Sequence, residues 1–417
     1  MALPISNRVM GSYSSNGGRE TPFLLIGNPA NKRTKGLQAA RSKLGLAPAV
    51  VLSYEQLLKR NVYIQDVLQQ MTGGGEIIIR LDAPGEDQAV ERELIAWGAP
   101  DRSGDDVFWS ASSLPERISI SATDALALPL QHGRIYYPAQ WYRGYCRFLA
   151  AMQREVRASK IAVRWVNSPG SIASMFDKRS CWQLLSRHGL RVPALPAPVG
   201  AVRSYDELQT AISSSGMRRL FIKLACGSGA SGVIAYQINP RTGDELAITT
   251  IGIEEHAGSS SFYNAGLLRH YREHSDIRQI IDWVCREGAH IERWIEKDSF
   301  ESKSFDVRQL VVNGEACHTV LRLSSTPITN LHLRNERRMD IDGILSAEVK
   351  QAVKLTSEAA LRAFPGSTAA GVDVLVQRGS GLTYAIDINP FGDLLYGAEY
   401  EGMNTYEWQM RELLRKE

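Results

Sequence analysis

The segments that decide the fold are Ala370-Gly-Val-Asp-Val-Leu-Val376 and Tyr384-Ala-Ile-Asp-Ile-Asn389, two alternating runs joined by a tight, glycine-containing turn. The alternation and the turn predict an antiparallel hairpin centred near Ser380. In that register Asp373 faces Asp387, and Asn389 lies two residues further along the same face. The valines and isoleucines share the other face, so the acidic face is not the core face.

The acidic face of this hairpin is a candidate metal site. Like charges placed directly opposite lower stability unless a cation lies between them. Asp373, Asp387 and Asn389 offer only hard oxygen donors, which suit Mg²⁺. The alternative is a solvated hairpin face whose acids bind nothing, and the spacing alone leaves both interpretations open.

A Gly-rich segment, Gly227-Ser-Gly-Ala-Ser-Gly232, separates two further strand-like runs. It matches G-x-G-x-x-G, but a dinucleotide site requires a helix next, and the P-loop pattern is absent from the sequence. We therefore expect a hairpin loop whose amides, with Ser228 and Ser231, could close over phosphates. Lys223 alternates with core residues on the preceding strand, and it is either a phosphate ligand or a solvated charge.

A second hairpin is predicted around Asn313-Gly314, with Phe305–Val312 as its first strand. Arg308 shares one face of that strand with Asp306. A guanidinium suits phosphate oxygens, although an exposed strand arginine often binds nothing specific. A lysine that precedes the Gly-rich loop, without H-R-D or D-F-G motifs, argues against a protein kinase.

The remaining sequence predicts two folded parts. Residues 1–20 are expected to be a flexible tail, and residues 21–168 a small α/β domain with a parallel sheet. Its strands are expected at residues 23–27, 49–52 and 76–80, and its helices at 34–44, 86–97 and 138–157. Residues 169–417 predict an α+β domain that opens with one helix, capped by Ser171 and continuing through residue 185. Residues 239–261 carry poor strand signals and are expected to form a surface loop.

The bulk composition excludes several classes of protein. A net charge of +3 gives no reason to expect nucleic acid or a membrane surface as partner. The five cysteines are scattered, which argues against a disulfide framework and a zinc site and favours a reducing cytoplasm. No run of about eighteen apolar residues predicts a membrane span.

Taken in order, these segments resemble the ATP-grasp superfamily, with the resemblance covering residues 170 to about 395. The sequence is most similar to the branch of glutamate-adding and ribosomal-peptide ligases, because Thr329-Asn-Leu-His-Leu333 resembles that branch's polar loop. The resemblance implies an α/β N-terminal domain followed by an α+β ATP-grasp fold of two lobes. It also implies ATP-dependent joining of a small-molecule or peptide carboxylate to an amine through an acyl phosphate, by a protein that could be a homodimer.

The resemblance further implies roles for individual residues. Catalysis would involve Arg308, Lys223 and Asn330, and Mg²⁺ would be held by Asp373, Asp387 and Asn389. ATP would be bound by two lysines, a mobile loop and a hinge: Lys178, Lys223, Ser228, Gly229, Ala230, Ser231, Glu292, Arg293, Trp294 and Ile295. The family's second metal ligand is commonly Glu, and Asp387 is one methylene shorter. Arg334, Arg337 and Arg338 follow the polar loop and indicate either an anionic substrate or a basic surface.

Two rival functions share the same nucleotide site. One is a phosphotransferase that stops at a phosphorylated small molecule, and the other is a non-catalytic ATP-binding regulator. No general base is evident, because His332 is a lone loop histidine. The identity of the substrates is not readable from these patterns.

Overall fold

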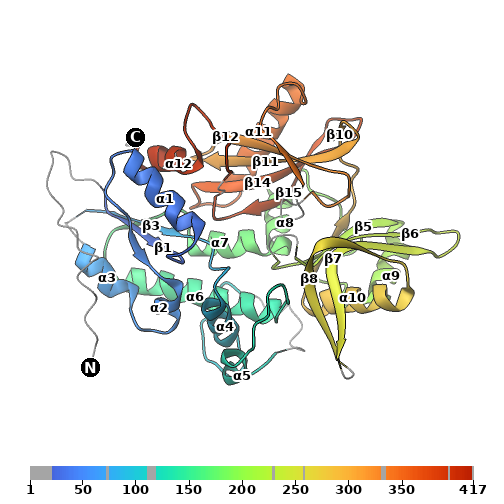
Figure 1. The fold of residues 1–417 in the computed structure, drawn as a ribbon, viewed down its shortest axis with the longest axis horizontal. Coiled ribbons are helices and arrows are strands. Elements are labelled where there is room, and N and C mark those ends of the chain that lie inside the picture. The colour runs from blue at the N-terminus through green and yellow to red at the C-terminus, as the bar shows by residue number, and fades with distance from the viewer. Residues whose placement is uncertain are drawn as a thin grey trace.

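The structure is a computed structural model that describes residues 21–71, 75–109, 119–227, 231–256, 259–329, 335–392 and 395–415. Its described strands form three sheets, which Figure 1 shows in blue, yellow-green and orange-red. The three sheets follow one another along the chain.

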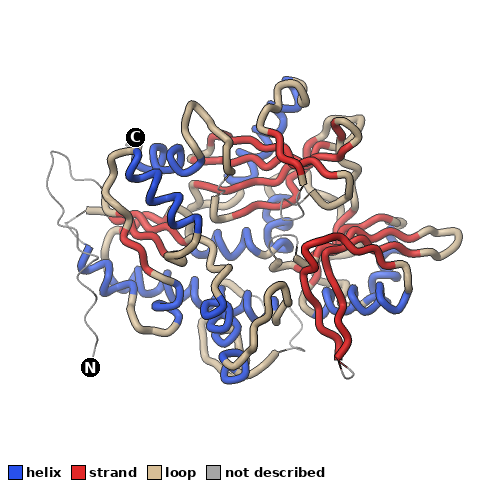
Figure 2. Tube along the Cα trace, viewed as in Figure 1, coloured by secondary structure: helices blue, strands red, loops and turns tan. Residues whose placement is uncertain are grey.

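The first sheet is parallel, with the strand order β2-β1-β3-β4. Helices flank it (Figure 2). Strands β1 and β3 are buried along their whole length, as expected for a parallel sheet covered on both faces. The elements of this part are β1 (Phe23–Ile26), α1 (Lys32–Lys43), β2 (Val50–Leu52), α2 (Tyr54–Leu58), α3 (Ile64–Met71), β3 (Ile77–Leu81), α4 (Gln88–Trp97), α5 (Ala122–Leu126), α6 (Pro138–Ser159) and β4 (Val163–Trp165). The predicted parallel sheet is confirmed.

The single helix expected after residue 169 is two helices, and this prediction was wrong in detail. Ser168, not Ser171, caps α7 (Pro169–Phe176) by accepting from the amide of Ser171. Asp177 then leaves the helical conformation and caps α8 (Lys178–Arg187). The break occurs there because the Asp177 carboxylate accepts from the amide of Arg179, one of the free amides in the first turn of the new helix.

The second sheet is antiparallel, with the order β8-β7-β6-β5-β9. Its elements are α9 (Tyr205–Ser215), β5 (Arg219–Leu224), β6 (Val233–Ile238), β7 (Glu245–His256), β8 (Ser259–Tyr271), α10 (His274–Arg286) and β9 (Ala289–Arg293). The loop expected over residues 239–261 is wrong, because most of it belongs to β7 and the start of β8. Exposed Glu254 and Glu255 on β7 hide the alternation that would have predicted a strand.

The third sheet has the order β13-β12-β11-β14-β15, with β10 paired to β11. Its elements are β10 (Ser299–Phe300), β11 (Lys303–Val312), β12 (Glu315–Ser324), β13 (Glu336–Arg338), α11 (Ala347–Arg362), β14 (Ala369–Val376) and β15 (Thr383–Asn389). Both predicted hairpins are present. Asn313 and Gly314 have positive φ values of 48° and 81°, as a tight hairpin turn requires.

The last helix, α12 (Thr405–Leu414), returns to the N-terminal part and packs against α1. Trp408 and Met410 of α12 share a buried cluster with Phe23 and Leu37. A second cluster joins the N-terminal core to Phe391, just beyond β15. The first and last parts of the chain therefore share hydrophobic cores.

Candidate active site

Strands β14 and β15 bring the two predicted acidic ligands together. Asp373 pairs with Asp387 across the ladder, as expected from the sequence, but a β-bulge directly beyond this pair shifts the register, so that Val374 pairs with Ala385 instead of Ile386. On the opposite face Val372 and Val374 are fully buried and pack with Ala385 and Ile388. Ile386 was also expected on that apolar face, and this was wrong: the bulge puts Ala385 there, and Ile386 is half-buried and lines a cavity beside Asp387. Asn389 lies two residues beyond Asp387, next to Gly371 of the partner strand.

Asp373 is surrounded by cations rather than by solvent. Arg308 Nε lies 2.7 Å from Oδ1, and an Nη atom of Arg322 lies 3.0 Å from Oδ2. Oδ1 is nonetheless a buried oxygen that accepts no hydrogen bond from the described residues. Both oxygens are already beside a guanidinium group, but an ionised carboxylate has about four acceptor sites, so Asp373 keeps coordinating capacity for a further cation.

Arg322 also joins Asp373 to a second buried acid, Asp306. Its Nε lies 2.6 Å from Asp306 Oδ1, and Lys297 Nζ lies 3.1 Å from Oδ2. Burial raises the pKa of Asp306, but Arg322 and Lys297 outweigh burial and hold the pKa below its usual range. Thr329 donates a further hydrogen bond to the same carboxylate. The acid therefore stays charged inside the protein.

Sequence reasoning missed Arg322, Asp306, Lys297 and Thr329 as site residues. If the β11–β12 ladder continued without interruption from the Asn313-Gly314 turn, Asp306 would pair with Leu321. A β-bulge between Gln309 and Val311 shifts the register, so that Asp306 pairs with Arg322. The opposite charges on neighbouring strands were the available signal, and the bulge concealed it.

Lys178 connects the acidic hairpin to the Gly-rich segment. Its Nζ donates to Asp387 Oδ2 at 3.0 Å and to the Gly227 carbonyl at 3.1 Å. Burial lowers the pKa of Lys178, but Asp387 outweighs burial, so the pKa is raised above its ordinary value. The lysine is therefore a fixed cation beside the candidate metal ligands.

Lys223 faces a buried acid on the neighbouring strand. Its Nζ lies 2.5 Å from Glu292 Oε1, and His290 Nε2 lies 3.0 Å from Oε2. Burial raises the pKa of Glu292, but Lys223 and His290 outweigh it and lower the pKa to about 2. Lys223 is thus held in place by an ion pair and is not a solvated strand charge.

Two backbone amides of the predicted hinge, residues 292–295, donate hydrogen bonds within the protein. The amide of Arg293 donates to the Ala194 carbonyl, and the amide of Trp294 donates to the Arg219 carbonyl. Arg219 also stacks over the Trp294 ring, with its guanidinium carbon 4.1 Å from the ring centre. The structure therefore fixes Arg293 and Trp294, and their amides are engaged within the protein.

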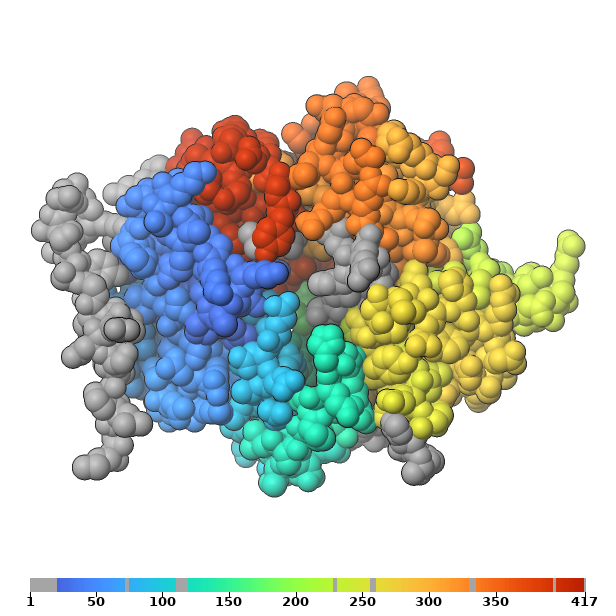
Figure 3. All heavy atoms as spheres, in the orientation of Figure 1, coloured from blue at the N-terminus to red at the C-terminus, as the bar shows by residue number. Residues whose placement is uncertain are grey.

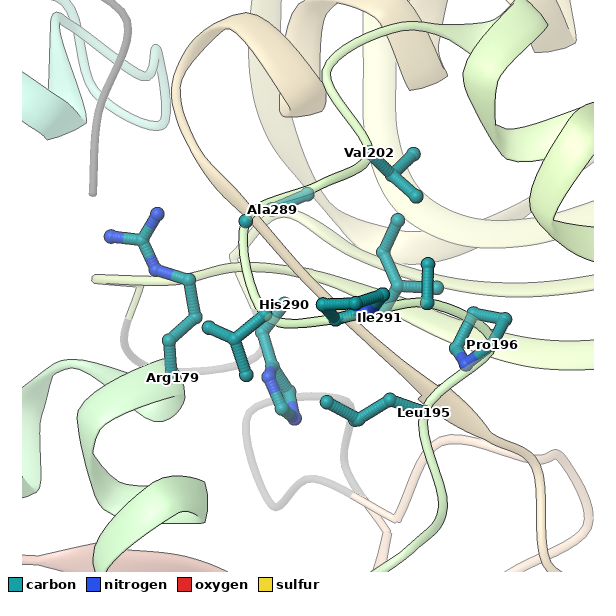
Figure 4. Close-up of a pocket in the computed structure, with 11 residues that line it drawn as sticks. Arg179, Leu195, Pro196, Val202, Ala289, His290 and Ile291 are labelled. Atoms are coloured by element: carbon teal, nitrogen blue, oxygen red, sulfur yellow. The ribbon is translucent and has the colours of Figure 1, made fainter. Parts of the chain in front are cut away.

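Two small cavities adjoin these groups, and His290 lines both. One has about 240 Å³ of empty space and is lined by residues that include Lys178, Glu292, Ile386 and Asp387. The other, with about 280 Å³, lies between Arg179, the segment from Leu195 to Val202, and β9 (Figure 4). Figure 3 shows a recess near the centre of the molecule, between the N-terminal part in blue, the region of the second sheet in yellow and the region of the third sheet in orange and red.

The structure does not describe all of the predicted site. Ser228, Gly229, Ala230 and Asn330 lie outside the described residues, as do His332 and Arg334. Ser231 is described and leads through Gly232, which has a φ of +70°, into β6. A Cβ at Gly232 would lie 2.3 Å from the Leu224 side chain, so the exit of the Gly-rich segment requires glycine.

Three solved structures resemble the chain over most of its length. D-cycloserine synthetase has a TM-score of 0.50 and 11% identity, covering 94% of this chain and 100% of its own. The biotin carboxylase domain of Hydrogenobacter thermophilus 2-oxoglutarate carboxylase has a TM-score of 0.51 and 11% identity, covering 96% and 71%. N5-carboxyaminoimidazole ribonucleotide synthetase has a TM-score of 0.50 and 9% identity, covering 95% and 77%. These three share the fold of the ATP-grasp ligases.

The chain has the ATP-grasp fold. No protein-family model matches the sequence, and no curated protein matches it. At 9–11% identity the likeness concerns the fold, so the activity has to be argued from the site.

The donor set of this ATP-grasp fold suits a hard divalent cation. Within the described ranges, no group of three or more His, Cys, Asp or Glu side chains could hold a metal ion. The candidate donors on β14 and β15 are the two carboxylates of Asp373 and Asp387 and the amide of Asn389, a set that would leave other positions for water and phosphate. That partial coordination suits Mg²⁺, which keeps several waters and is commonly shared with substrate phosphates.

Among the helices that the structure describes, none is both long enough and apolar enough to cross a membrane. All five cysteines are described, buried and free. Cys181 lines the same cavity as Lys178 and Asp387.

Proposed function

We propose that the protein is an ATP- and Mg²⁺-dependent ligase that joins a carboxylate to an amine through an acyl phosphate. One observation carries the proposal: Asp373 and Asp387 face each other on paired strands, and Lys178 links Asp387 to the Gly-rich segment. The fold supports it, since the biotin carboxylase domain was solved with MgADP and bicarbonate, and the ribonucleotide synthetase with ADP.

The charges of the site suit this chemistry. A carboxylate that attacks the γ-phosphate brings anions together, and Lys178, Lys223 and Arg308 would offset that repulsion and hold the reacting atoms in line. Bound Mg²⁺, held by Asp373, Asp387 and Asn389, would supply positive charge to the phosphates. Arg322 and Lys297 would keep Asp306 charged and fixed beside these ligands. ADP then leaves, and an amine displaces phosphate from the activated carboxylate.

The nucleotide would lie between the second and third sheets, which we propose as the two lobes of the fold. Residues Ser228, Gly229, Ala230 and Ser231 would close over the phosphates and exclude water. The adenine would approach the hinge at Ile295 and the cavity lined by Lys178 and Ile386. Residues 21–168 would form the domain that contributes to substrate choice. A cytoplasmic homodimer remains part of the proposal.

The test is ADP release in the presence of pairs of carboxylates and amines, with mass detection of the conjugate. Hydroxylamine should divert an acyl phosphate to a hydroxamate. A stable phosphorylated product would instead identify a phosphotransferase. Tight ATP binding without ADP release, for every pair offered, would identify a regulator and overturn the proposal.

The lysine at the centre of the site gives a matched pair of variants. We expect Lys178→Met to lower ADP release about 100-fold, because one preorganised cation is lost from the developing negative charge. Lys59→Met is the control, because the ion pair of Lys59 with Glu55 is exposed and Lys59 is far from Lys178 in the sequence. Equal rates of ADP release in the two variants would show that Lys178 has no role in the mechanism.

A further inference from the structure

The three residues that follow Asn389 are held by side chains from the N-terminal part of the chain. The Pro390 carbonyl accepts from Asn167 Nδ2. The Phe391 carbonyl accepts from Arg80 at 2.5 Å, and the Gly392 carbonyl accepts from Arg33 at 2.9 Å. Three consecutive peptide units are thus fixed immediately after the predicted metal ligand.

Arg80 is the most deeply buried of these donors. It lies on β3, is 2% exposed, and donates a second hydrogen bond, at 2.8 Å, to Gln409 Oε1 of α12. The nearest carboxylate oxygen, of Asp82, is 3.9 Å from its Nε. Burying a guanidinium costs several kcal/mol unless its hydrogen bonds are satisfied. An apolar residue would fill this core position at lower cost, so the stability of β3 does not explain the arginine.

The side chain of Phe391 strengthens the same connection. Its ring packs edge-on against Phe176, with the ring centres 6.4 Å apart. Phe176 ends α7, two residues before Lys178. The N-terminal core therefore contacts both the end of the metal-ligand strand and the start of the helix that carries Lys178.

Gly392 completes the arrangement. Its φ is +58°, and a Cβ there would lie 2.9 Å from Gln409 Oε1, the atom that also accepts from Arg80. Glycine is required because the backbone must pass this close to α12 in a left-handed conformation. The turn after Asn389 is built around the Arg80–Gln409 pair.

We propose that Arg80, assisted by Arg33 and Asn167, is a positioning residue that fixes Asn389 for metal binding. The inference rests on the proposed function, since it takes Asn389 as a Mg²⁺ ligand. Asn389 is one peptide unit from the first clamped carbonyl, so loss of the clamp lets its amide oxygen leave the metal position. Groups that orient metal ligands commonly change affinity about 10–100-fold when removed.

The experiment measures Mn²⁺ binding by electron paramagnetic resonance, in the presence of a non-hydrolysable ATP analogue, for the full chain. We expect Arg80→Met to weaken Mn²⁺ binding about tenfold. Nucleotide affinity in EDTA should change less than about twofold, and Arg80→Lys should restore part of the Mn²⁺ affinity. Arg41→Met is the matched control, because Arg41 is an arginine of α1 that is 1% exposed and contacts α12 at Met410.

A second pair of variants tests the inference even if the Arg80→Met variant does not fold. Arg33 is partly exposed on α1, and Lys35 is exposed two residues further along. Arg33→Ala should weaken Mn²⁺ binding, whereas Lys35→Ala should not. Equal Mn²⁺ affinity in Arg80→Met and Arg41→Met, or in Arg33→Ala and Lys35→Ala, overturns the inference and leaves the proposed function standing. A wild-type chain that binds neither nucleotide nor Mn²⁺ overturns both.

Discussion

Glu292 stays charged in the candidate site, as do Asp306 and Lys178, because each has a partner of opposite charge at hydrogen-bonding distance. Glu292 is 3% exposed, and an unpaired carboxylate so deeply buried would be protonated. Lys223 and His290 reverse that effect and place its pKa at about 2, against an ordinary value of 4.5. A depressed pKa means that the charged form stabilises the fold above pH 4.5, and that this stabilisation is lost as the pH falls toward 2.

We therefore predict that Glu292→Gln destabilises the protein by on the order of 3 kcal/mol at pH 7, from the size of the pKa depression. The difference from wild type should shrink as the pH falls below 4.5. Urea denaturation at several pH values measures it. Glu55→Gln is the control, because the ion pair of Glu55 is exposed and contributes little. A difference that does not change with pH would contradict the assigned ion pair.

The sequence predicted which face of a strand a residue occupies, but it did not predict how deeply that face is buried. Alternation placed Lys223 and Arg308 on the polar faces of their strands, which is where the structure has them. Alternation says nothing of what covers a face, so the burial of Asp306 and its pairing with Arg322 were not foreseen. The roles expected for Asn330 and for residues 228–230 stay predictions.

At the scale of elements, two hairpins were predictable because each has alternating strands and a glycine turn. The pattern of valines and isoleucines predicted the pairing of Asp373 with Asp387, but not the bulge beside it, which puts Ala385 in place of Ile386 on the buried face. The long β7–β8 hairpin was not predictable. Strand β7 is held between β6 and β8, and β8 pairs with β7, so both strands depend on ladder partners that are distant from the local sequence pattern.

Helices α4 and α6 show how closely elements approach in the N-terminal part. A Cβ at Gly144 in α6 would lie 1.8 Å from the Leu94 carbonyl oxygen, and a Cβ at Gly98 would lie 1.8 Å from the Gln140 carbonyl oxygen. Backbone atoms cannot yield as a flexible side chain can. The two glycines therefore set the distance between the helices.

We predict that Gly144→Ala lowers the free energy of unfolding by about 3 kcal/mol or more, because the helices must separate. Gly343→Ala is the control, since a Cβ at Gly343 meets no atom within 4 Å. Thermal melts of the two variants compare the effects. A Gly144→Ala melting temperature equal to that of the control would show that the helices move apart without cost.

At the scale of the whole molecule, the last helix, α12, packs against the N-terminal helix α1. The predicted boundary at residue 168 falls between β4 of the first sheet and β5 of the second, and two hydrophobic clusters contain residues from both sides of it. Leu37 of α1 and Trp408 of α12 belong to one buried cluster, as do Leu24 of β1 and Phe391. The sequence predicted the sheet of the first part, and it gave no sign that the last helix packs against it.

The shared cores predict that residues 169–417 do not fold stably without residues 21–168. Trp408, Met410 and Leu413 of α12 are each no more than 2% exposed, and losing their partners would cost about 2–3 kcal/mol for each side chain. That loss is comparable to the whole stability of an ordinary domain. Circular dichroism melts and limited proteolysis of the fragment test the prediction, with a chain lacking only residues 1–20 as the control that should melt like wild type. A fragment that melts cooperatively at the wild-type temperature would show that the ATP-grasp part is independent, and that contacts between α1 and α12 only dock two finished domains.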